Sequence, residues 1–326
     1  MVNHQDIFSI STNEEFNKLA LDVFKFQFEN NPVYRSFCDL LYKHPSEVKS
    51  YESIPFLPIE FFKTHTILSN DKIAEKTFSS SGTTGSLLSK HFITDLHLYE
   101  TSFLRSFKEF YGNIEEYTIL ALLPSYLERE GSSLIYMVNE LIKHSNKEES
   151  GFYINNLSEL RDTIQELESN GRKTLLIGVS FALLDLIEKH QLQLKHTMVM
   201  ETGGMKGKRK ELIRHELHSL LKTGFGVKTI HSEYGMTELL SQAYSKSDGI
   251  FNCPKWMKVL TRDTEDSLTL IKDSKTGGIN IIDLANINSC SFIATQDLGK
   301  VYPDDSFEIL GRFDTSDIRG CNLMAL

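Results

Sequence analysis

Between residues 117 and 244, short apolar segments alternate with segments of helical spacing, and this alternation constrains the fold more than any other feature. In chain order, the pairs are YTILALL with GSSLIYMVNELIKH, KTLLIGV with FALLDLIEKH, HTMVM with RKELIRHELHSLLK, and VKTIH with TELLSQAY. Such alternation predicts an α/β fold in which helices cover a parallel sheet. Ligands of these sheets bind at the carboxyl ends of strands, where this chain carries the polar loops TGG and SEYGMTE.

The segments on either side of this region follow other patterns. Thr12-x-x-Glu15 predicts a capping box at the start of a helix, and Pro32 interrupts the helical pattern that follows. IPFLPIEFFK, residues 54–63, contains two prolines and is predicted to be extended. After Ile250, four segments resemble strands joined by Asp/Gly/Ser turns: WMKVLTR, SLTLIKD, GINIIDL and SFEILGR. We therefore expect an α/β core at 1–250 and a smaller β-rich subdomain at 251–326.

Charge and composition exclude several classes of protein. The chain has 326 residues, of which 35 are basic and 44 acidic, and its formal charge of −9 argues against a nucleic-acid or anionic-membrane partner. It has no apolar run long enough to span a membrane, and its start, MVNHQDIFSI, lacks the regions of a signal peptide. No C-x-x-C pair occurs, which argues against structural zinc and a disulfide framework. We expect a cytoplasmic globular protein with no transmembrane segment.

Residues 78–91, FSSSGTTGSLLSKH, concentrate Ser, Thr and Gly in one stretch. A loop of this composition can wrap closely around a polyanion, because its backbone N–H groups are free of side-chain bulk and its hydroxyls add donors. It does not match the Walker A pattern. On composition alone, a solvated loop is the commoner explanation, so other signals must decide.

Those signals come from three further motifs. SSGTTG, residues 80–85, resembles the phosphate-binding loop of the adenylate-forming superfamily, which includes acyl-CoA synthetases and luciferases. YGMTE (234–238), QDLGKV (296–301) and GRFDTSDIRG (311–320) resemble the second, third and fourth signatures of that superfamily, in the same order. FQFENNPVYRSFC, IPFLPIEFFKTH, PSYLEREGSSLIYMV and FNCPKWMKVL are similar to the acyl-protein synthetases, the fatty-acid-activating components of bacterial bioluminescence reductase complexes.

The resemblance implies a fold like the N-terminal domain of adenylate-forming enzymes, and it implies a reaction. With ATP and Mg²⁺, a carboxylic acid, with a fatty acid as first choice, would form an acyl-adenylate. The acyl group would then pass to a protein thiol, and the partner would be an acyl-accepting reductase. Because both the carboxylate and the α-phosphate are anionic, the protein must neutralise charge and align the two groups.

The resemblance also assigns roles to individual residues. The β- and γ-phosphates would be held by Ser80, Ser81, Gly82, Thr83, Thr84 and Gly85. Thr237 would contact the α-phosphate, and Glu238 would hold Mg²⁺, as a carboxylate beside phosphates commonly does. Asp297 would bind the ribose hydroxyls, and Arg312 the ribose or a phosphate. The adenine pocket would consist of Tyr234, which would stack on the base, together with Gly235, Met236, Gly203 and Gly204.

The sequence departs from the superfamily pattern in three places. A basic residue is expected soon after the phosphate loop, but here the first one is Lys90. The Thr-Gly pair before Asp297 is replaced by Thr295-Gln296. The sequence given ends six residues after Gly320, so we expect the mobile C-terminal domain of larger members, with its catalytic lysine, to be absent. Adenylation would then be slow, or a partner residue would complete it. Cys321 is the candidate acyl carrier, and its neighbour Arg319 would favour the thiolate.

Alternatives remain open for most of these residues. Glu238 could be a helix-terminal acid, Gly203-Gly204 an ordinary turn, Asp297 and Arg312 surface charges, and Cys321 an idle thiol. Gly178-x-Ser180-x-Ala182 resembles the nucleophile elbow of a serine hydrolase or acyltransferase, although its last position is not Gly. His215-x-x-His218 could face a metal but supplies no third ligand. A further alternative is a non-catalytic nucleotide-binding subunit of a reductase complex.

Overall fold

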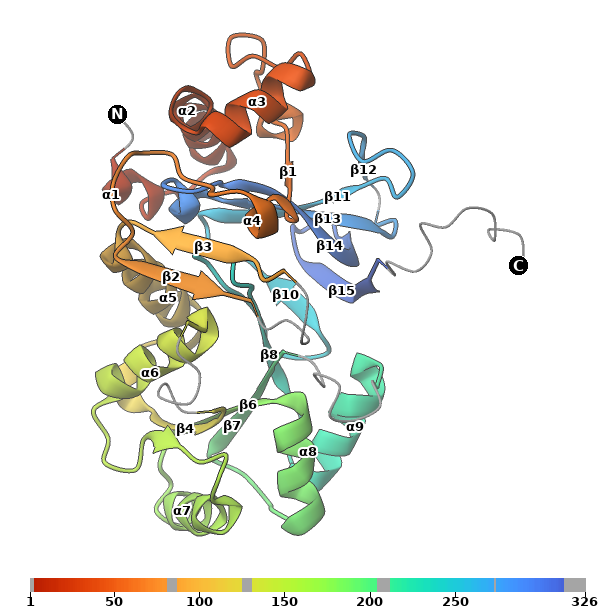
Figure 1. Ribbon diagram of the computed structural model, residues 1–326. Coiled ribbons are helices and arrows are strands. Elements are labelled where there is room, and N and C mark those ends of the chain that lie inside the picture. Colours follow the sequence, from red (N-terminus) through yellow and green to blue (C-terminus); the bar gives the residue numbers. More distant parts are fainter. Residues whose placement is uncertain (1–2, 81–86, 125–130, 204–211, 273, 314–326) are drawn as a thin grey trace.

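The computed structural model describes residues 3–80, 87–124, 131–203, 212–272 and 274–313. Within them, one thirteen-stranded sheet runs through the molecule (Figure 1). Its strand order is β12-β11-β13-β14-β15-β10-β9-β8-β7-β6-β4-β5, and β1 (Leu57–Pro58) pairs with β14 beside this path. A separate two-stranded sheet is formed by β2 (Lys76–Ser79) and β3 (Lys90–Ile93).

One half of the large sheet is parallel. Its strands are β5 (Gly151–Phe152), β4 (Thr118–Leu122), β6 (Thr174–Val179), β7 (Thr197–Thr202) and β8 (His231–Tyr234). The helices of this half are α5 (Leu96–Tyr111), α6 (Ser133–Ser145), α7 (Leu157–Ser169), α8 (Ser180–Lys189) and α9 (Arg214–Phe225). Figure 1 shows the pair α5–α6 and the pair α8–α9 on opposite sides of these strands. The predicted α/β class and the first three strand–helix alternations are confirmed.

The fourth predicted helix, TELLSQAY, is wrong. The chain turns at Thr237 and Glu238 and then enters β9 (Ala243–Ser245), which pairs antiparallel with β8. All residues from Glu238 to Ser245 are buried, so tertiary contacts on every side replace the one-sided contacts of a surface helix. The helical spacing of the apolar residues was therefore misleading at this point.

The other half of the sheet is antiparallel and continues directly from β9. It comprises β10 (Ile250–Asn252), β15 (Phe307–Arg312), β14 (Phe292–Val301), β13 (Gly277–Asp283), β11 (Met257–Arg262) and β12 (Leu270–Ile271). The four strands predicted after residue 250 are confirmed, and β14 is an additional long strand that the pattern did not reveal. The domain boundary at residue 250 stays a prediction.

The N-terminal segment packs against the antiparallel half. The capping box is confirmed: Thr12 Oγ1 accepts from the Glu15 amide at 3.2 Å, and Glu15 Oε2 accepts from the Thr12 amide at 3.1 Å. The helical pattern is interrupted as predicted, because α2 ends at Asn30 and Pro32 begins a second helix, whereas residues 61–63 of the segment predicted to be extended belong to a short helix. The helices here are α1 (His4–Ile7), α2 (Asn13–Asn30), α3 (Pro32–Leu40) and α4 (Phe61–Thr64). Three 3₁₀ turns complete the described elements: Tyr51–Ser53, Ile114–Glu116 and Leu284–Asn286.

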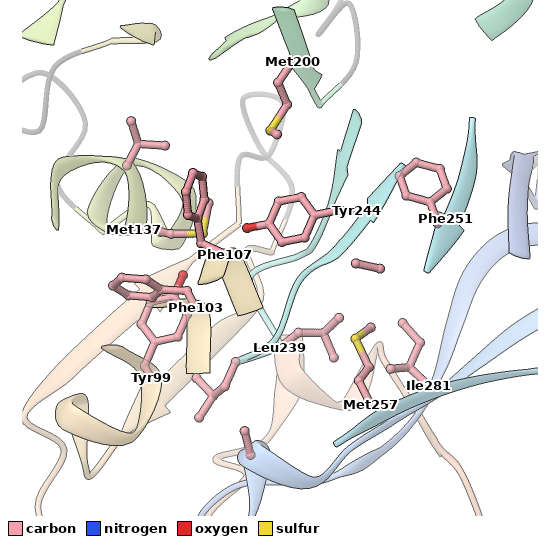
Figure 2. Close-up of a cluster of buried hydrophobic side chains, with 14 of the residues drawn as sticks. Tyr99, Phe103, Phe107, Met137, Met200, Leu239, Tyr244, Phe251, Met257 and Ile281 are labelled. Carbon is pink, nitrogen blue, oxygen red and sulfur yellow. The ribbon is translucent and has the colours of Figure 1, made fainter. Parts of the chain in front are cut away.

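The hydrophobic core is continuous across the two halves. Figure 2 shows aromatic side chains of α5 facing Met137 of α6 and Tyr244 of β9, with Leu239, Met257 and Ile281 extending the cluster toward the antiparallel strands. Leu239 lies in the turn after β8, so this core anchors the backbone that carries Thr237 and Glu238. Among the described residues, no helix combines the length and apolar character that a membrane span requires.

Candidate nucleotide-binding site

Two of the sequence signatures meet at the base of the β2–β3 connection. The Ser80 amide donates to the Ser89 carbonyl at 3.1 Å, and the Ser89 amide donates to Ser80 Oγ at 3.0 Å. The Ser89 hydroxyl also hydrogen-bonds the carboxylate of Glu238. Residues 81–86 lie outside the described part of the chain, whereas Ser80 and Ser89, on either side of them, are bonded to each other next to Glu238. The residues that flank the predicted phosphate loop and the predicted metal ligand therefore lie together.

Glu238 is a buried carboxylate, with 5% of its surface exposed. Burial raises its pKa, while hydrogen bonds from Ser89 and its own amide and the charges of Arg312 and Lys63 act in the opposite direction. No helix begins at Glu238, so the helix-terminal alternative does not hold. A buried anion beside hydroxyl oxygens has the chemistry of an Mg²⁺ ligand.

No group of three His, Cys, Asp or Glu side chains suited to a metal occurs among the described residues. Mg²⁺ is typically held by one or two carboxylates together with substrate phosphates and water, rather than by a cage made only of protein. Glu238 therefore fits a metal that arrives with a nucleotide, and it does not fit a resident structural ion.

The turn that carries Thr237 and Glu238 is held by side chains from distant segments. His91 Nδ1 lies 2.8 Å from the Thr237 carbonyl, and its Nε2 lies 3.0 Å from Asn286 Oδ1. Asn286 Nδ2 donates to the Glu238 carbonyl at 2.8 Å. Burial lowers the pKa of His91 to about 4, so the imidazole is neutral at physiological pH. His91 and Asn286 were not among the predicted site residues, and the one available signal was that His91 closes the hydroxyl-rich stretch.

Asp283 supports the same turn from the end of β13. Its carboxylate accepts from the amides of Leu240 at 2.8 Å and Ser241 at 2.9 Å, and from Ser241 Oγ at 2.6 Å. Burial raises its pKa to about 6, and these hydrogen bonds oppose that shift. The amides that would have continued a helix after Glu238 are thus satisfied by a carboxylate 42 and 43 residues away in sequence.

The second, third and fourth signatures meet through a chain of polar side chains. Tyr234 donates its hydroxyl hydrogen to Asp297 Oδ2 at 2.7 Å, and Arg312 Nε lies 3.2 Å from Asp297 Oδ1. Asp297 is 8% exposed and is therefore not a solvated surface charge, whereas the Arg312 side chain is 70% exposed. The Tyr234 ring packs against Phe251 and Phe307 with centroids 5.8 and 5.6 Å away. These polar contacts thus lead from the partly buried ring of Tyr234 to the exposed guanidinium of Arg312.

The ends of β7 and β8 are joined by a second carboxylate. Thr202 Oγ1 donates to Glu233 Oε2 at 2.5 Å. A Cβ at Gly235 would lie 2.6 Å from Glu233 Oε1, so a larger residue there would displace the Glu233 carboxylate. Burial, reinforced by Glu201, raises the pKa of Glu233 to about 7. Glu233 was not predicted as a site residue, although it lies within the loop SEYGMTE.

Gly203 follows Thr202 with a φ of +65°, a left-handed conformation that glycine adopts without strain. Its carbonyl accepts from Ser180 Oγ at 2.8 Å. Ser180 therefore fastens this turn, and among the described residues no histidine is hydrogen-bonded to it as a nucleophile would need. The geometry gives no support to the hydrolase alternative.

The two histidines of α9 do not form a metal site. His215 is exposed, whereas His218 is buried, with Nε2 3.5 Å from Glu201 Oε1. Their environments differ, and the described residues near them include no third ligand arrangement suited to a metal.

Of the other predicted residues, Met236 is partly buried against the core, and its carbonyl accepts from the Leu239 amide at 3.1 Å. The remaining predictions lie outside the described residues: Ser81, Gly82, Thr83, Thr84, Gly85, Gly204 and Cys321. A cleft of about 410 Å³ between the start of α2 and strands β10 and β11 contains none of the signature residues. The site is therefore defined by the meeting of the signatures and not by that cleft.

The fold around this site is that of the adenylate-forming acyl-CoA ligases. A 2-hydroxyisobutyryl-CoA ligase matches with a TM-score of 0.66 over 93% of this chain and 68% of its own, at 14% identity. ATP-bound MatB from Rhodopseudomonas palustris matches with a TM-score of 0.53 over 72% of this chain, at 17% identity. That match covers 47% of MatB, so the chain spans about half the length of this enzyme. At these identities the likeness establishes the fold.

Sequence comparison finds two relatives that are both named as fatty-acid ligases. Over 94% of its length, the chain is 22% identical to the long-chain-fatty-acid–luciferin-component ligase of Vibrio harveyi, of which the match covers 86%. A ligase of the same name from Photorhabdus luminescens is 35% identical over 69 residues, which are 21% of this chain and 59% of that protein. No family model matches the chain. The resemblance to the acyl-protein synthetases within the adenylate-forming superfamily is confirmed by these relatives.

Proposed function

We propose that this protein is an AMP-forming ligase that uses ATP and Mg²⁺ to activate a carboxylic acid, with a fatty acid as first choice. The single observation that carries the proposal is the meeting of the four signatures around Glu238, through Ser80 and Ser89 on one side and Asp297 and Arg312 on the other. The names of the relatives, which are fatty-acid ligases and CoA ligases, support the same reaction.

The residues divide the task of activation between them. The acid carboxylate attacks the α-phosphorus of ATP, the bond to the β-phosphate breaks, and pyrophosphate leaves. Thr237 and the Ser80 end of the loop would bind phosphate oxygens, while Asp297 would accept from the ribose hydroxyls. Glu238 would hold Mg²⁺, which neutralises phosphate charge when bound. Burial of Glu238 strengthens that attraction, because little water competes for the carboxylate.

Acid-dependent ATP–pyrophosphate exchange tests the proposal directly. The purified chain is incubated with labelled pyrophosphate, ATP, Mg²⁺ and a panel of saturated fatty acids of increasing length, with aryl acids as controls. We expect exchange that depends on both the acid and the metal. Absence of exchange with every acid, with a reductase partner also present, would instead favour the non-catalytic nucleotide-binding subunit.

We further propose that the activated acyl group passes to Cys321 and from there to a partner protein, an aldehyde-forming reductase of the cytoplasm. The thiolate would attack the acyl carbonyl, the bond to the phosphate oxygen would break, and AMP would leave. Thiolates attack activated acyl groups more readily than hydroxyls do. This step rests on the sequence resemblance alone, since Cys321 lies outside the described residues.

Labelling separates this transfer from activation. With radioactive acid and ATP, the wild-type chain should acquire a hydroxylamine-labile label on denaturing gels. The variant Cys321→Ser should keep exchange and lose the label, whereas Cys253→Ser serves as the matched control. Equal labelling of Cys321→Ser and the wild type would mean that the acyl group goes from the adenylate directly to the partner.

A further inference from the structure

The short helix α4 contacts two segments of the site at once. The Ile59 amide, just before the helix, donates to the Ala294 carbonyl of β14 at 3.0 Å, and the Glu60 carboxylate accepts from the side chain of Gln296. On the other side, the buried ring of Phe62 packs edge-on against His91 with centroids 5.7 Å apart. Figure 1 shows α4 beside β14 and β3. This helix therefore lies between Gln296, which precedes Asp297 on β14, and His91, which contacts the Thr237 carbonyl.

This placement brings a positive charge to the site. Lys63 on α4 and Arg312 on β15 are the two cations whose charges act on the Glu238 carboxylate. Arg312 is paired with Asp297, with Nε 3.2 Å from Oδ1. Lys63 is exposed and forms no ion pair with any residue that the structure describes. Its ammonium group is consequently available to an anionic ligand in a way that the Arg312 guanidinium is not.

Lys90 is the first basic residue after the hydroxyl-rich loop, but its side chain lies on the face of the strand that is turned away from Thr237 and Glu238. Side chains alternate between the two faces of a strand, and His91 and Ser89 point toward Thr237 and Glu238. Lys90 lies between them in sequence and is exposed. The charge expected from Lys90 is thus absent from the face where the two signatures meet.

We propose that Lys63 is a catalytic residue that contacts the phosphates of bound ATP and supplies the positive charge that Lys90 does not. This inference rests on the proposed function and extends it to a residue outside the four signatures. As the carboxylate–phosphorus bond forms and the bond to the β-phosphate breaks, negative charge accumulates on the departing pyrophosphate. A lysine ammonium offers three donors to those oxygens, and no proton needs to be transferred.

The competing explanation is structural. Lys63 lies in the last turn of α4, where a cation is favoured by the helix carbonyls, and that role requires no ligand. A one-turn helix gains little from such a cation, whereas a hydrogen bond to an anionic phosphate is among the stronger polar contacts. The two explanations differ in what Lys63→Met should change: stability alone, or the response to nucleotide.

The test compares Lys63→Met, Lys63→Arg and the matched surface control Lys43→Met by exchange kinetics, thermal unfolding and calorimetric binding of Mg²⁺–ATP. Lys63→Met should lower kcat/KM for ATP in exchange by about ten- to a hundredfold, with an unchanged unfolding midpoint. Lys63→Arg should restore most of the activity, and Lys43→Met should behave as wild type. The affinity for Mg²⁺–ATP should fall in Lys63→Met alone.

Wild-type exchange and nucleotide affinity in Lys63→Met would overturn the inference and leave the proposed function intact. A lowered unfolding midpoint without rescue by arginine would overturn it as well, in favour of the structural role. A wild-type chain that fails to exchange would instead refute the proposed function. The binding measurement would still decide whether Lys63 contacts the nucleotide.

Discussion

The turn after β8 and the β14–β15 hairpin carry adjacent parts of the proposed site, yet they differ in how their residues are held. In the turn, residues 235–241, three buried side chains form hydrogen bonds with the backbone: His91, Asp283 and Asn286. In the hairpin, Asp297 and Arg312 are direct partners in the antiparallel register, and Arg312 reaches solvent. Substitutions in the turn should therefore affect both stability and activity, except where a side chain contacts only the ligand. Substitutions in the hairpin should affect ligand affinity alone.

Glu238 provides the strongest test, because it is the turn residue that we propose to hold Mg²⁺. Glu238→Gln keeps the shape and removes the charge, so exchange should fall at least about a thousandfold, or roughly 4 kcal/mol in activation free energy. The unfolding free energy should not fall at neutral pH, since burial raises the pKa of this group and disfavours its charged form. Near-wild-type exchange in the variant would show that the carboxylate has no metal to hold.

Asp283 should show the opposite behaviour, with a large effect on stability. In Asp283→Asn, the amide nitrogen cannot accept, so at least one of the donors from Leu240 and Ser241 is left without an acceptor in a buried site. We expect a loss of about 4 kcal/mol in unfolding free energy, measured by denaturant titration at pH 7.5. Ser247→Ala, at a partly exposed position in the turn between β9 and β10, serves as the control. A stable variant with low exchange would break the comparison, because Asp283 would then act on the ligand and not on the backbone.

The contrast between the turn and the hairpin also explains which features of the fold and the site could be predicted from the sequence. The signatures at Tyr234–Glu238, Asp297 and Arg312 were identified from the sequence, and the parallel strands followed from apolar runs bounded by turns. The supports of the turn were not identifiable, since His91 contacts Thr237 across 146 residues and no local pattern reports such a contact. The helix predicted at TELLSQAY failed for the same reason: the amides after Glu238 bond to Asp283 on another strand. Local spacing could not reveal an acceptor brought in by the fold.

Glu233, at the end of β8, links stability to pH. Its folded pKa of about 7 lies above its ordinary value of 4.5, so its contribution to stability is full below pH 4.5 and is lost as the pH rises through 7. This shift corresponds to about 3 kcal/mol. Between pH 4.5 and 8, the unfolding free energy of the wild type should fall by that amount relative to Glu233→Gln. The groups facing Glu233 are Thr202 and Glu201 on β7, Tyr99 and Tyr111 on α5, and Tyr244 on β9.

Parallel pH profiles for Glu233→Gln and the wild type would contradict this assignment. Because Asp283 titrates in both proteins, its contribution cancels in the difference, and the comparison isolates the carboxyl group of Glu233. The result also bears on the contrast between the turn and the hairpin. A strong pH dependence would show that the buried contacts that support the turn include the hydrogen bond from Thr202 of β7 to Glu233 of β8.

Asp297 should give the smallest effect, and one confined to the nucleotide. In Asp297→Asn, the side chain can still accept from the Tyr234 hydroxyl, so the hairpin should fold normally. The loss of charge weakens acceptance from the ribose hydroxyls and the pairing with Arg312, and we expect KM for ATP to rise about tenfold with kcat within about twofold. Exchange kinetics with 2′-deoxy-ATP sharpen the test, because the variant and the wild type should then differ less than they do with ATP. An equal difference with both nucleotides would mean that Asp297 serves the Tyr234–Arg312 chain and does not contact the 2′-hydroxyl of the ribose.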